Sequence, residues 1–422
     1  MNKIQNIQTF LLNNGLKLVF YKKNDLPIVD INLWVKIGSK NETEKNSGIS
    51  HFLEHIVFKN TKSFPNNAIS REIEDIGGLM NAATSIDYTH FYITLASKYA
   101  EKAFFAISDM AFNLELEEKN FNLEKGVIIE EIELYKNHPS SNLFENIYKH
   151  FFSISDFVYS RPIIGTKQNI LDMKTLDLKS YYDKNYNPCN MVLFVAGDLE
   201  FEKVKDLANK YFNVKKSNNN FKENLNFNGD IYLKKSPLTF ENSMSTINQT
   251  YFAITFNSFD YSNIKKFTLS KILSKILGQG QSSKLYKALK LDKNLVWDIN
   301  ASIFDQKYAS LFSIYGQCEY KNLEEIEKVI FDEINNFSKT FINAELEKIK
   351  NILAFGNEIE FETVNNITSI LGYYEVMSKF EDFFEIKNII KSITIKDILD
   401  IKSEIFDKNK FFVKEILKPE NA

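Results

Sequence analysis

The sequence predicts an α+β fold built from two similar halves, each an α/β sandwich in which helices pack on a mixed or antiparallel sheet. In the first 213 residues, strand-like runs come first and long helical runs follow. The same order returns after a polar, Asn-rich stretch at residues 215–227, which is typical of a linker. We therefore expect an N-terminal half at residues 1–213, a linker at 214–228 and a C-terminal half at 229–422.

Turn residues and period-two alternation indicate the N-terminal strands. Residues 8–12 and 16–21 flank Asn13-Asn14-Gly15, a turn sequence that favours a β-hairpin. Between residues 27 and 37, apolar side chains occupy every second position, which predicts a strand with one buried face and one solvated face. Further strands are expected at residues 79–87, 89–95 and 191–196.

Apolar residues at helical spacing indicate the helices of this half. The short helix that carries residues 51–55 is expected to be capped by Ser47 or Ser50. Gly77-Gly78 is expected to end the next helix, at residues 66–76. Further helices are expected at residues 98–114, 117–137, 141–152, 177–186 and 201–212.

The C-terminal half repeats this pattern but contains no histidine. Strands are expected at residues 249–256, 298–304, 309–315 and 410–416, and helices at 265–277, 282–289 and, in series, from 323 to about 401. All five histidines lie at or before residue 150. His90, His138 and His150 lack partners at a useful spacing and are expected to be packing or surface residues. A histidine-based site must therefore belong to the N-terminal half.

Composition and charge exclude several classes of protein. The chain of 422 residues is 44% hydrophobic and has a net charge of −3, which fits a globular protein and offers no electrostatic basis for nucleic-acid binding. No apolar run approaches about 18 residues, so no membrane span is expected. The first residues lack the apolar core of a signal peptide, and we expect a cytoplasmic protein.

Residues 51–55 read His-Phe-Leu-Glu-His. In a helix, a rotation of about 100° per residue places His51, Glu54 and His55 on one face. Two neutral imidazoles suit a zinc ion, and a carboxylate beside them suits a general base for zinc-bound water. The order is the reverse of the commoner His-Glu-x-x-His motif. Taken alone, such a motif can also arise by chance on a surface helix.

A catalytic zinc usually takes three protein ligands, so a third must come from elsewhere in the chain. Glu131 falls on the same helical stripe as Val127, Ile128 and Ile132. A carboxylate on an apolar stripe is costly unless it is paired or binds a metal, which makes Glu131 the candidate. Glu124 lies two turns earlier on the same face. It is placed to hydrogen-bond a ligand histidine, although it also fits an ordinary helix carboxylate.

With these residues the chain resembles the pitrilysin/insulinase family of inverted-zincin metallopeptidases. Glu131 follows His55 by 76 residues, which matches the family pattern. Other family motifs are matched along the whole chain by Gly77-Gly78-x-x-Asn81-Ala82-x-Thr84, Arg161-Pro162-x-x-Gly165, Tyr186-x-Pro188-x-Asn190 and Gly278-x-Gly280-x-Ser282. In length the chain is similar to the short members with two α/β halves, such as the beta subunit of the mitochondrial processing peptidase.

The resemblance implies a zinc endopeptidase with one Zn²⁺ per chain. It assigns His51, His55 and Glu131 to the metal. Glu54 would take a proton from the zinc-bound water and later pass it to the leaving amine. Glu124 would belong to the catalytic group as a support for the ligands.

The resemblance also implies how a peptide binds. The strand around Asn81 and Ala82 would pair with the main chain of the substrate, although Asn81 also fits an ordinary turn or edge-strand residue. Main-chain pairing reads little sequence, and the short members usually dimerise into a closed chamber. Oligopeptides and unfolded segments are therefore the expected substrates.

One family feature is altered in this chain. Active members typically carry an Arg and, seven residues later, a Tyr in the C-terminal half, and both contact the substrate. Here Lys290 and Trp297 occupy these positions; Lys lacks the bidentate fork and Trp lacks a hydroxyl. They are either weakened substitutes or residues freed by a partner. We expect a homodimer, or a heterodimer with a family chain that carries the Arg/Tyr pair. The alternative function is a non-catalytic structural or assembly subunit of the same fold, as in the respiratory chain.

Overall fold

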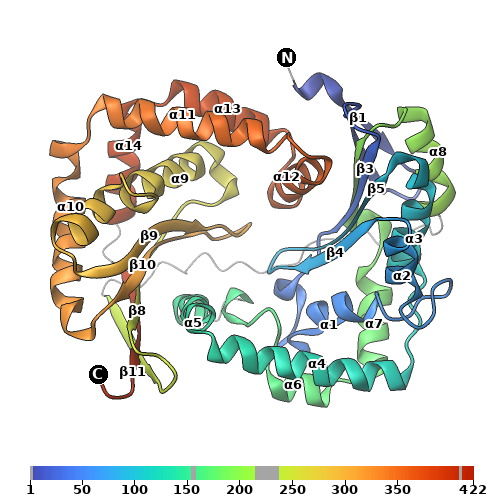
Figure 1. The fold of residues 1–422 in the computed structure, drawn as a ribbon, viewed down its shortest axis with the longest axis horizontal. Coiled ribbons are helices and arrows are strands. Elements are labelled where there is room, and N and C mark those ends of the chain that lie inside the picture. The colour runs from blue at the N-terminus through green and yellow to red at the C-terminus, as the bar shows by residue number, and fades with distance from the viewer. Residues whose placement is uncertain (1–2, 154–157, 214–236, 408–410) are drawn as a thin grey trace. The chain divides into compact units, whose positions relative to one another are not determined.

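The chain forms two compact units, as described by a computed structural model of residues 3–153, 158–213, 237–407 and 411–422 (Figure 1). The first unit contains the described residues of Met1–Glu133, Arg161–Phe227 and Glu358–Phe383. The second contains those of Leu134–Ser160, Asn228–Asn357 and Phe384–Ala422. Each unit combines a mixed sheet with helices, so the predicted α+β fold with two similar halves is confirmed. The predicted linker at 214–228 lies outside the described residues, and the predicted boundaries stay a prediction.

The first unit is built on a six-stranded sheet. Its strands are β1 (Ile7–Leu11), β2 (Lys17–Lys22), β3 (Ile28–Val35), β4 (Leu79–Thr84), β5 (Thr89–Ala96) and β6 (Met191–Gly197). The strand order is β1-β2-β6-β3-β5-β4, which leaves β4 at an edge. Neighbouring strands are antiparallel except β2 and β6, which are parallel. The hairpin predicted at the N-terminus is present as β1 and β2.

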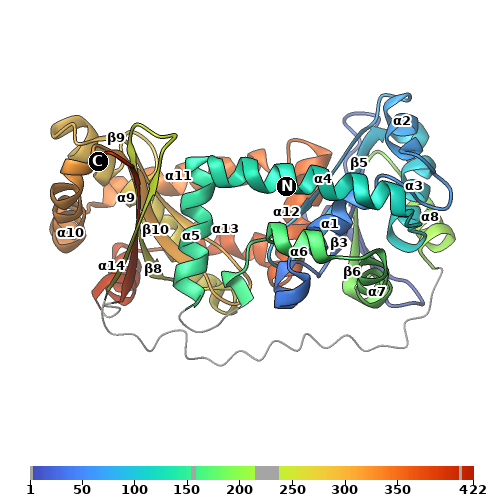
Figure 2. The same ribbon diagram turned by 90° about the horizontal axis from the view of Figure 1, so that it is seen from below.

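Helices cover both faces of this sheet. They are α1 (Ile49–Ile56), α2 (Ala68–Glu74), α3 (Ala100–Phe112), α4 (Glu118–Asn137, whose last turn belongs to the second unit), α6 (Lys167–Asp172), α7 (Thr175–Asn185), α8 (Phe201–Phe212) and α12 (Val364–Met377). α3 and α8 lie side by side against one face (Figures 1 and 2). α12 lies against the other face, and α1 contacts the edge strand β4.

Strand β3 is buried along nearly its whole length, so the prediction of a half-solvated strand is wrong. Its polar side chains Asp30 and Asn32 are fully buried under α12. Thr368 of α12 donates a hydrogen bond to Asp30 and accepts one from Asn32 over 3.3 Å, so both buried polar groups have partners. A polar face that a hydrogen-bonding helix covers has the same sequence pattern as a face in water, and alternation alone cannot separate the two.

The second unit is built on a five-stranded sheet with the order β7-β11-β8-β10-β9. Its strands are β7 (Leu238–Met244), β8 (Thr250–Asn257), β9 (Val296–Phe304), β10 (Leu311–Cys318) and β11 (Phe412–Pro419). β7 and β11 are parallel, and the other pairs are antiparallel. Four of these strands were expected from alternation. β7 was not expected, because this edge strand is mostly polar and largely exposed.

The helices of the second unit are α5 (Pro139–Ser153), α9 (Ile264–Gly278), α10 (Leu323–Thr340), α11 (Asn343–Ile359, which ends in the first unit), α13 (Asp382–Ser392, which starts in the first unit) and α14 (Ile395–Lys402). α5 packs on β8 and β11, and α9 packs on β9. The helix predicted at residues 282–289 lies further along the chain and is π-helical at Tyr286–Asp292. The predicted helical series after residue 323 is present as separate helices.

Among the helices of the described residues, none combines the length and the apolar character needed to cross a membrane. The longest, α4, has 20 residues and carries acidic and basic side chains along its length. The predicted cytoplasmic location stays a prediction.

The N-terminus of α1 is held by a carboxylate, and the predicted caps Ser47 and Ser50 are wrong. Glu42 accepts hydrogen bonds from the backbone amides of Gly48, over 2.7 Å, and Ser50, over 2.8 Å. Burial raises the pKa of Glu42 to about 8, although these amides and the nearby Arg161 act to lower it. Gly48 has a φ of +92°, which favours glycine. The residue that satisfies the first amides of α1 therefore lies in the preceding loop, outside the usual capping position.

We predict that Gly372→Ala destabilises the first unit. Gly372 lies on α12, and a Cβ there would be 2.1 Å from Nε1 of the buried Trp34. The overlap requires the indole or the helix to move, which should lower the free energy of unfolding by about 1–3 kcal/mol. Urea unfolding followed by circular dichroism measures this change.

Gly126→Ala is the matched control for that variant. Gly126 also lies within a helix of the first unit, α4, but nothing outside its own helix lies within 4 Å of a Cβ at this position. Alanine there should raise the free energy of unfolding by about 0.5–1 kcal/mol. Equal stability of the two variants would contradict the tight contact between α12 and β3.

Candidate metal centre

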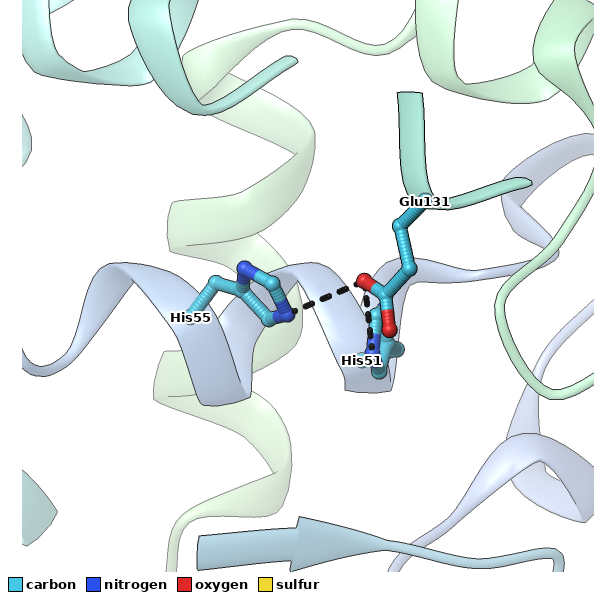
Figure 3. A group of neighbouring side chains, drawn as sticks. All are labelled: His51, His55 and Glu131. Carbon is cyan, nitrogen blue, oxygen red and sulfur yellow. Dashed lines mark ion pairs between the residues drawn. The ribbon is translucent and has the colours of Figure 1, made fainter. Parts of the chain in front are cut away.

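The three predicted ligands meet between α1 and α4 (Figure 3). His51 and His55 lie one turn apart on α1, with ring centroids 4.5 Å apart. Glu131 reaches them from α4, with its Oε2 atom 3.6 Å from Nε2 of His51 and 3.5 Å from Nε2 of His55. One ligand atom from each residue lies within 4.8 Å of the others. The structure therefore brings the three side chains together.

The donor set and its spacing fit a zinc ion. Bonds from zinc to nitrogen or oxygen are about 2.0–2.2 Å long, so tetrahedral ligand atoms lie roughly 3.3–3.5 Å apart. The nitrogen–oxygen distances of 3.5 and 3.6 Å match this spacing and are too long for good hydrogen bonds. Oε2 of Glu131 is buried and has no hydrogen-bond partner among the described residues. A cation held by the three side chains would satisfy that oxygen.

Glu131 lies at the margin of the buried face of α4 and not within it. That face is formed by Phe121, Glu124, Ile128 and Ile132. Val127, which was predicted on the buried stripe, is 48% exposed, so this part of the prediction is wrong. The observed stripe shares Ile128 and Ile132 with the expected one, but it runs back through Glu124 and leaves Val127 on the exposed side. Glu131 is thereby half-buried, within reach of α1 and of solvent.

Glu124 orients His55 from the side opposite the ligand group. Its Oε1 atom is 2.8 Å from Nδ1 of His55, which leaves Nε2 directed toward Glu131. Burial acts to lower the pKa of His55, but the bond to Glu124 and the surrounding carboxylate charges outweigh it and raise the pKa. Burial acts to raise the pKa of Glu124, but the bonds from His55 and Lys59 outweigh it. Glu124 is therefore held as a carboxylate.

Lys59 is a member of this group that sequence reasoning missed. Its ammonium group lies 3.1 Å from Oε2 of Glu124 and compensates the buried carboxylate. The spacing from His55 to Lys59 is four residues, which in a helix would place both side chains on one face and could have indicated Lys59. Lys59 lies just beyond the end of α1, whose last residue is Ile56, and a helical spacing was not evident there.

His51 differs from His55 in its electrostatic environment. Burial lowers the pKa of His51 to about 3, and the neighbouring His55 adds to the effect. His51 is therefore neutral at physiological pH, the state in which an imidazole binds a metal.

Glu54 lies beside this group on α1 and is held by the edge strand. Thr84, at the end of β4, donates a hydrogen bond to Oε2 of Glu54. Burial raises the pKa of Glu54, although Thr84 and His55 act to lower it. A carboxylate with a raised pKa is suited to accept and release a proton near neutral pH. Thr84 belonged to a recognised motif, but no role had been predicted for it.

Asn81 and Ala82 lie on the edge strand β4, as predicted. The backbone amide of Ala82 donates to the side-chain oxygen of Asn81, over 2.9 Å. This amide is therefore directed to the open edge and not to β5. Leu79, on the same strand, is 71% exposed. An edge strand with an amide directed outward is able to pair with another strand.

Lys290 and Trp297 belong to the second unit. Lys290 lies in the π-helical segment, and Trp297 lies on β9 with 46% of its surface exposed. Their relation to the histidine group stays a prediction. The other three histidines are packing or surface residues, as expected: His90 stacks on Trp34, His150 stacks on Phe240, and His138 is exposed.

Comparisons with known proteins place this geometry in a family. Residues 18–167 match the insulinase domain of peptidase family M16, and residues 173–353 match the peptidase M16 inactive domain. An uncharacterized zinc protease of Rickettsia felis is 27% identical over 95% of both chains, and one of Bacillus subtilis is 25% identical over 96% of both. Cytochrome b-c1 complex subunit 1 of Bos taurus mitochondria is 32% identical over 50% of this chain and 44% of its own.

Solved structures share the same fold. A protease from Helicobacter pylori superposes with a TM-score of 0.90 at 23% identity, over 98% of this chain and 99% of that one. A peptidase M16 inactive domain from Pseudomonas fluorescens superposes with a TM-score of 0.85 at 16% identity, over 98% of both chains. The two adjoining domain matches both name peptidase family M16. The relatives of similar length and the shared fold agree with that family. The chain belongs to the insulinase family of peptidases, family M16.

Proposed function

We propose that this protein is a zinc-dependent endopeptidase that hydrolyses peptide bonds in oligopeptides or unfolded segments. The observation that carries the proposal is the convergence of His51, His55 and Glu131 within 4.8 Å, with Glu54 on the same face of α1. The names of the full-length relatives, zinc proteases, support it. A metal site with its own carboxylate base is the arrangement that peptide hydrolysis requires.

The candidate ligands and Glu54 have separate roles in this proposal. His51, His55 and Glu131 would hold a zinc ion, which would supply a Lewis acid for the attacking water and the peptide carbonyl. Glu54 accepts the proton of the attacking water and passes it to the leaving nitrogen. Burial raises the pKa of Glu54, which makes it a stronger base for the first transfer.

Neighbouring residues position these groups. Glu124 fixes the ring of His55, and Lys59 balances the charge of Glu124. Thr84 fixes the carboxylate of Glu54 relative to β4. The base is thereby tied to the strand on which, by this proposal, the peptide binds.

Main-chain pairing at the edge of β4 would hold the peptide. The amide of Ala82 is directed outward, and it would exchange its bond to Asn81 for one to the substrate. Because such pairing requires an extended chain, folded proteins would be poor substrates.

We predict that the purified chain binds about one zinc and that His51→Ala abolishes the binding, because two ligands remain. Glu124→Gln should retain the site but lower zinc affinity about 10–100-fold. Mass spectrometry of the metal content, after dialysis against a zinc buffer, measures both. His138→Ala, at an exposed histidine, is the control and should bind zinc as the wild type does. Equal zinc content in His51→Ala and the wild type would refute the ligand assignment.

We predict that Glu54→Gln lowers kcat by at least about 10²-fold on an unstructured fluorogenic peptide, because glutamine cannot take the proton. The variant should keep its zinc, since Glu54 is not a ligand in this proposal. Activity lost together with zinc would point to a structural role for Glu54. Full activity of the zinc-loaded variant would exclude it as the base.

A non-catalytic structural or assembly subunit is the alternative function. The changes at Lys290 and Trp297 favour it, and one relative is a subunit of the cytochrome b-c1 complex. The three converging ligand side chains and the base oppose it, since a purely structural subunit has no need of them. Absence of zinc from the protein isolated from its native cell would favour this alternative.

We also propose that the active form is a dimer, either of two copies or with a family chain that carries the Arg/Tyr pair. Lys290 and Trp297 would form weaker hydrogen bonds to the substrate than the Arg/Tyr pair does. Leu123 and Val127, two exposed apolar side chains on α4, are available for a protein contact.

The substitution Lys290→Arg together with Trp297→Tyr tests this proposal. If a partner normally supplies the pair, the double variant should raise kcat/KM of the isolated chain by at least about 10-fold. The wild type alone is then expected to be slow. A wild-type kcat/KM within the usual enzyme range of roughly 10⁴–10⁸ M⁻¹ s⁻¹, in a chain that sediments as a monomer, would contradict the need for a partner.

A further inference from the structure

A fully buried ion pair lies between the loop before α1 and the turn that follows β4. Nζ of Lys40 is 3.0 Å from Oδ1 of Asp87, and both side chains are inaccessible to solvent. Lys40 belongs to a short 3-10 helix, Ser39–Asn41, and Asp87 belongs to the turn at residues 85–88 that joins β4 to β5. Both residues are part of the first unit.

A buried ion pair contributes little to stability. Moving two charges out of water costs free energy that their mutual attraction only about offsets. Each charge nevertheless requires the other, because either one alone would be buried without compensation. The pair of Lys40 and Asp87 is therefore better suited to fix the positions of two segments than to raise the stability of the unit.

Main-chain contacts join the same two segments. The amide of Ser39 donates to the carbonyl of Ser85 over 3.2 Å, and the amide of Lys40 donates to the carbonyl of Ile86 over 3.0 Å. Gly38 approaches the turn so closely that a Cβ there would be 2.3 Å from the carbonyl oxygen of Ser85. The loop therefore lies directly against the turn, and the ion pair adds a side-chain link to these main-chain links.

The two joined segments lead to the candidate site from opposite directions. Thr84, which donates a hydrogen bond to Glu54, is three residues before Asp87. Glu42, two residues after Lys40, accepts hydrogen bonds from the first amides of α1, the helix that carries Glu54 and both candidate ligand histidines. The ion pair therefore closes a ring of contacts that runs from β4 through the loop to α1 and returns to β4 through Glu54.

We propose that Lys40 and Asp87 are positioning residues that set the base Glu54 relative to the edge strand β4. The inference rests on the proposed function, in which the peptide pairs with β4 and Glu54 accepts the proton of water. Without the pair, the loop and the turn would shift against each other, and Glu54 would lose its alignment with the peptide on β4. A displacement of about 1 Å is enough to lower a rate roughly 10²-fold.

Removal of both charges tests the proposal. The pair variant, Lys40→Met with Asp87→Asn, leaves neither charge unpaired, so its melting temperature should stay within about 5 °C of the wild type. Its kcat on an unstructured fluorogenic peptide should fall about 10–100-fold at unchanged zinc content. In the Glu54→Gln background, the pair variant should change the dissociation constant of the same peptide less than about 3-fold, because the edge of β4 stays open.

Hydrogen–deuterium exchange gives a readout that does not require cleavage. Amides of residues 79–89 should exchange at least about 5-fold faster in the pair variant than in the wild type, while those of α3 should not change. Gly38→Ala displaces the same loop without a change of charge and should also lower kcat. It keeps the inference testable if the pair variant does not fold.

Lys17→Met with Glu375→Gln is the matched control. This ion pair also belongs to the first unit, with a nitrogen–oxygen distance of 2.9 Å, but it joins β2 to α12. Its loss should leave kcat unchanged, whatever its effect on the melting temperature. A control that loses as much kcat as the pair variant would overturn the inference.

A double-mutant cycle with Thr84→Val shows whether the pair acts through the bond between Thr84 and Glu54. If it does, the two losses of kcat should overlap, and the combined variant should be at most about 3-fold slower than the slower parent. Losses that multiply would place the effect of the pair elsewhere and overturn the inference.

The outcomes separate this inference from the proposed function. A folded pair variant with the kcat of the wild type, or with unchanged exchange at residues 79–89, would overturn the positioning role and leave the peptidase intact. A zinc-loaded wild type that cleaves no peptide would overturn the proposed function, and the positioning role would fall with it.

Discussion

The hydrogen bond between His55 and Glu124 is the contact on which the site depends, because it joins α1 to α4 at the point where the ligands meet. It directs Nε2 of His55 toward Glu131 and fixes which atom can bind a metal. It also requires a carboxylate to be buried, and Lys59 compensates for that burial. Without this bond the ring of His55 would be free to turn, while Glu124 would keep its ion pair with Lys59. The bond therefore fixes the orientation of a candidate ligand and takes part in the charge balance of the site.

The edge strand β4 combines two tasks because successive side chains of a strand point to opposite faces. On one face Thr84 donates a hydrogen bond to Glu54, and on the other Ala83 lines a pocket together with Trp34 and His90. Its open edge lies between the two. A peptide added there would present alternate side chains to the two faces.

Much of the fold could be predicted because the apolar patterns are strong. The hairpin of β1 and β2 and the helices α2, α3, α4, α5, α7 and α8 follow local turn and spacing rules, whereas the short helix α6 was not expected. The errors arose where a residue outside the local pattern changed its environment. The sequence pattern predicted a half-solvated β3, but in the structure α12 covers Asp30 and Asn32. The cap of α1 comes from Glu42, which precedes the helix by several residues and forms no recognisable capping motif.

The amino-acid sequence by itself determined the candidate metal-binding motif, since His51, Glu54 and His55 share a helix face through local geometry alone. It also indicated Glu131 and Glu124, whose spacing of two turns places them on one side of a helix. Only the tertiary structure decided how α4 rotates toward α1, which nitrogen of His55 is free, and that Lys59 and Thr84 complete the group. It alone formed the pocket beside Ala83, because Trp34, His90 and Glu360 come from segments far apart in the chain. Contacts of that kind depend on packing between elements, which no local pattern encodes.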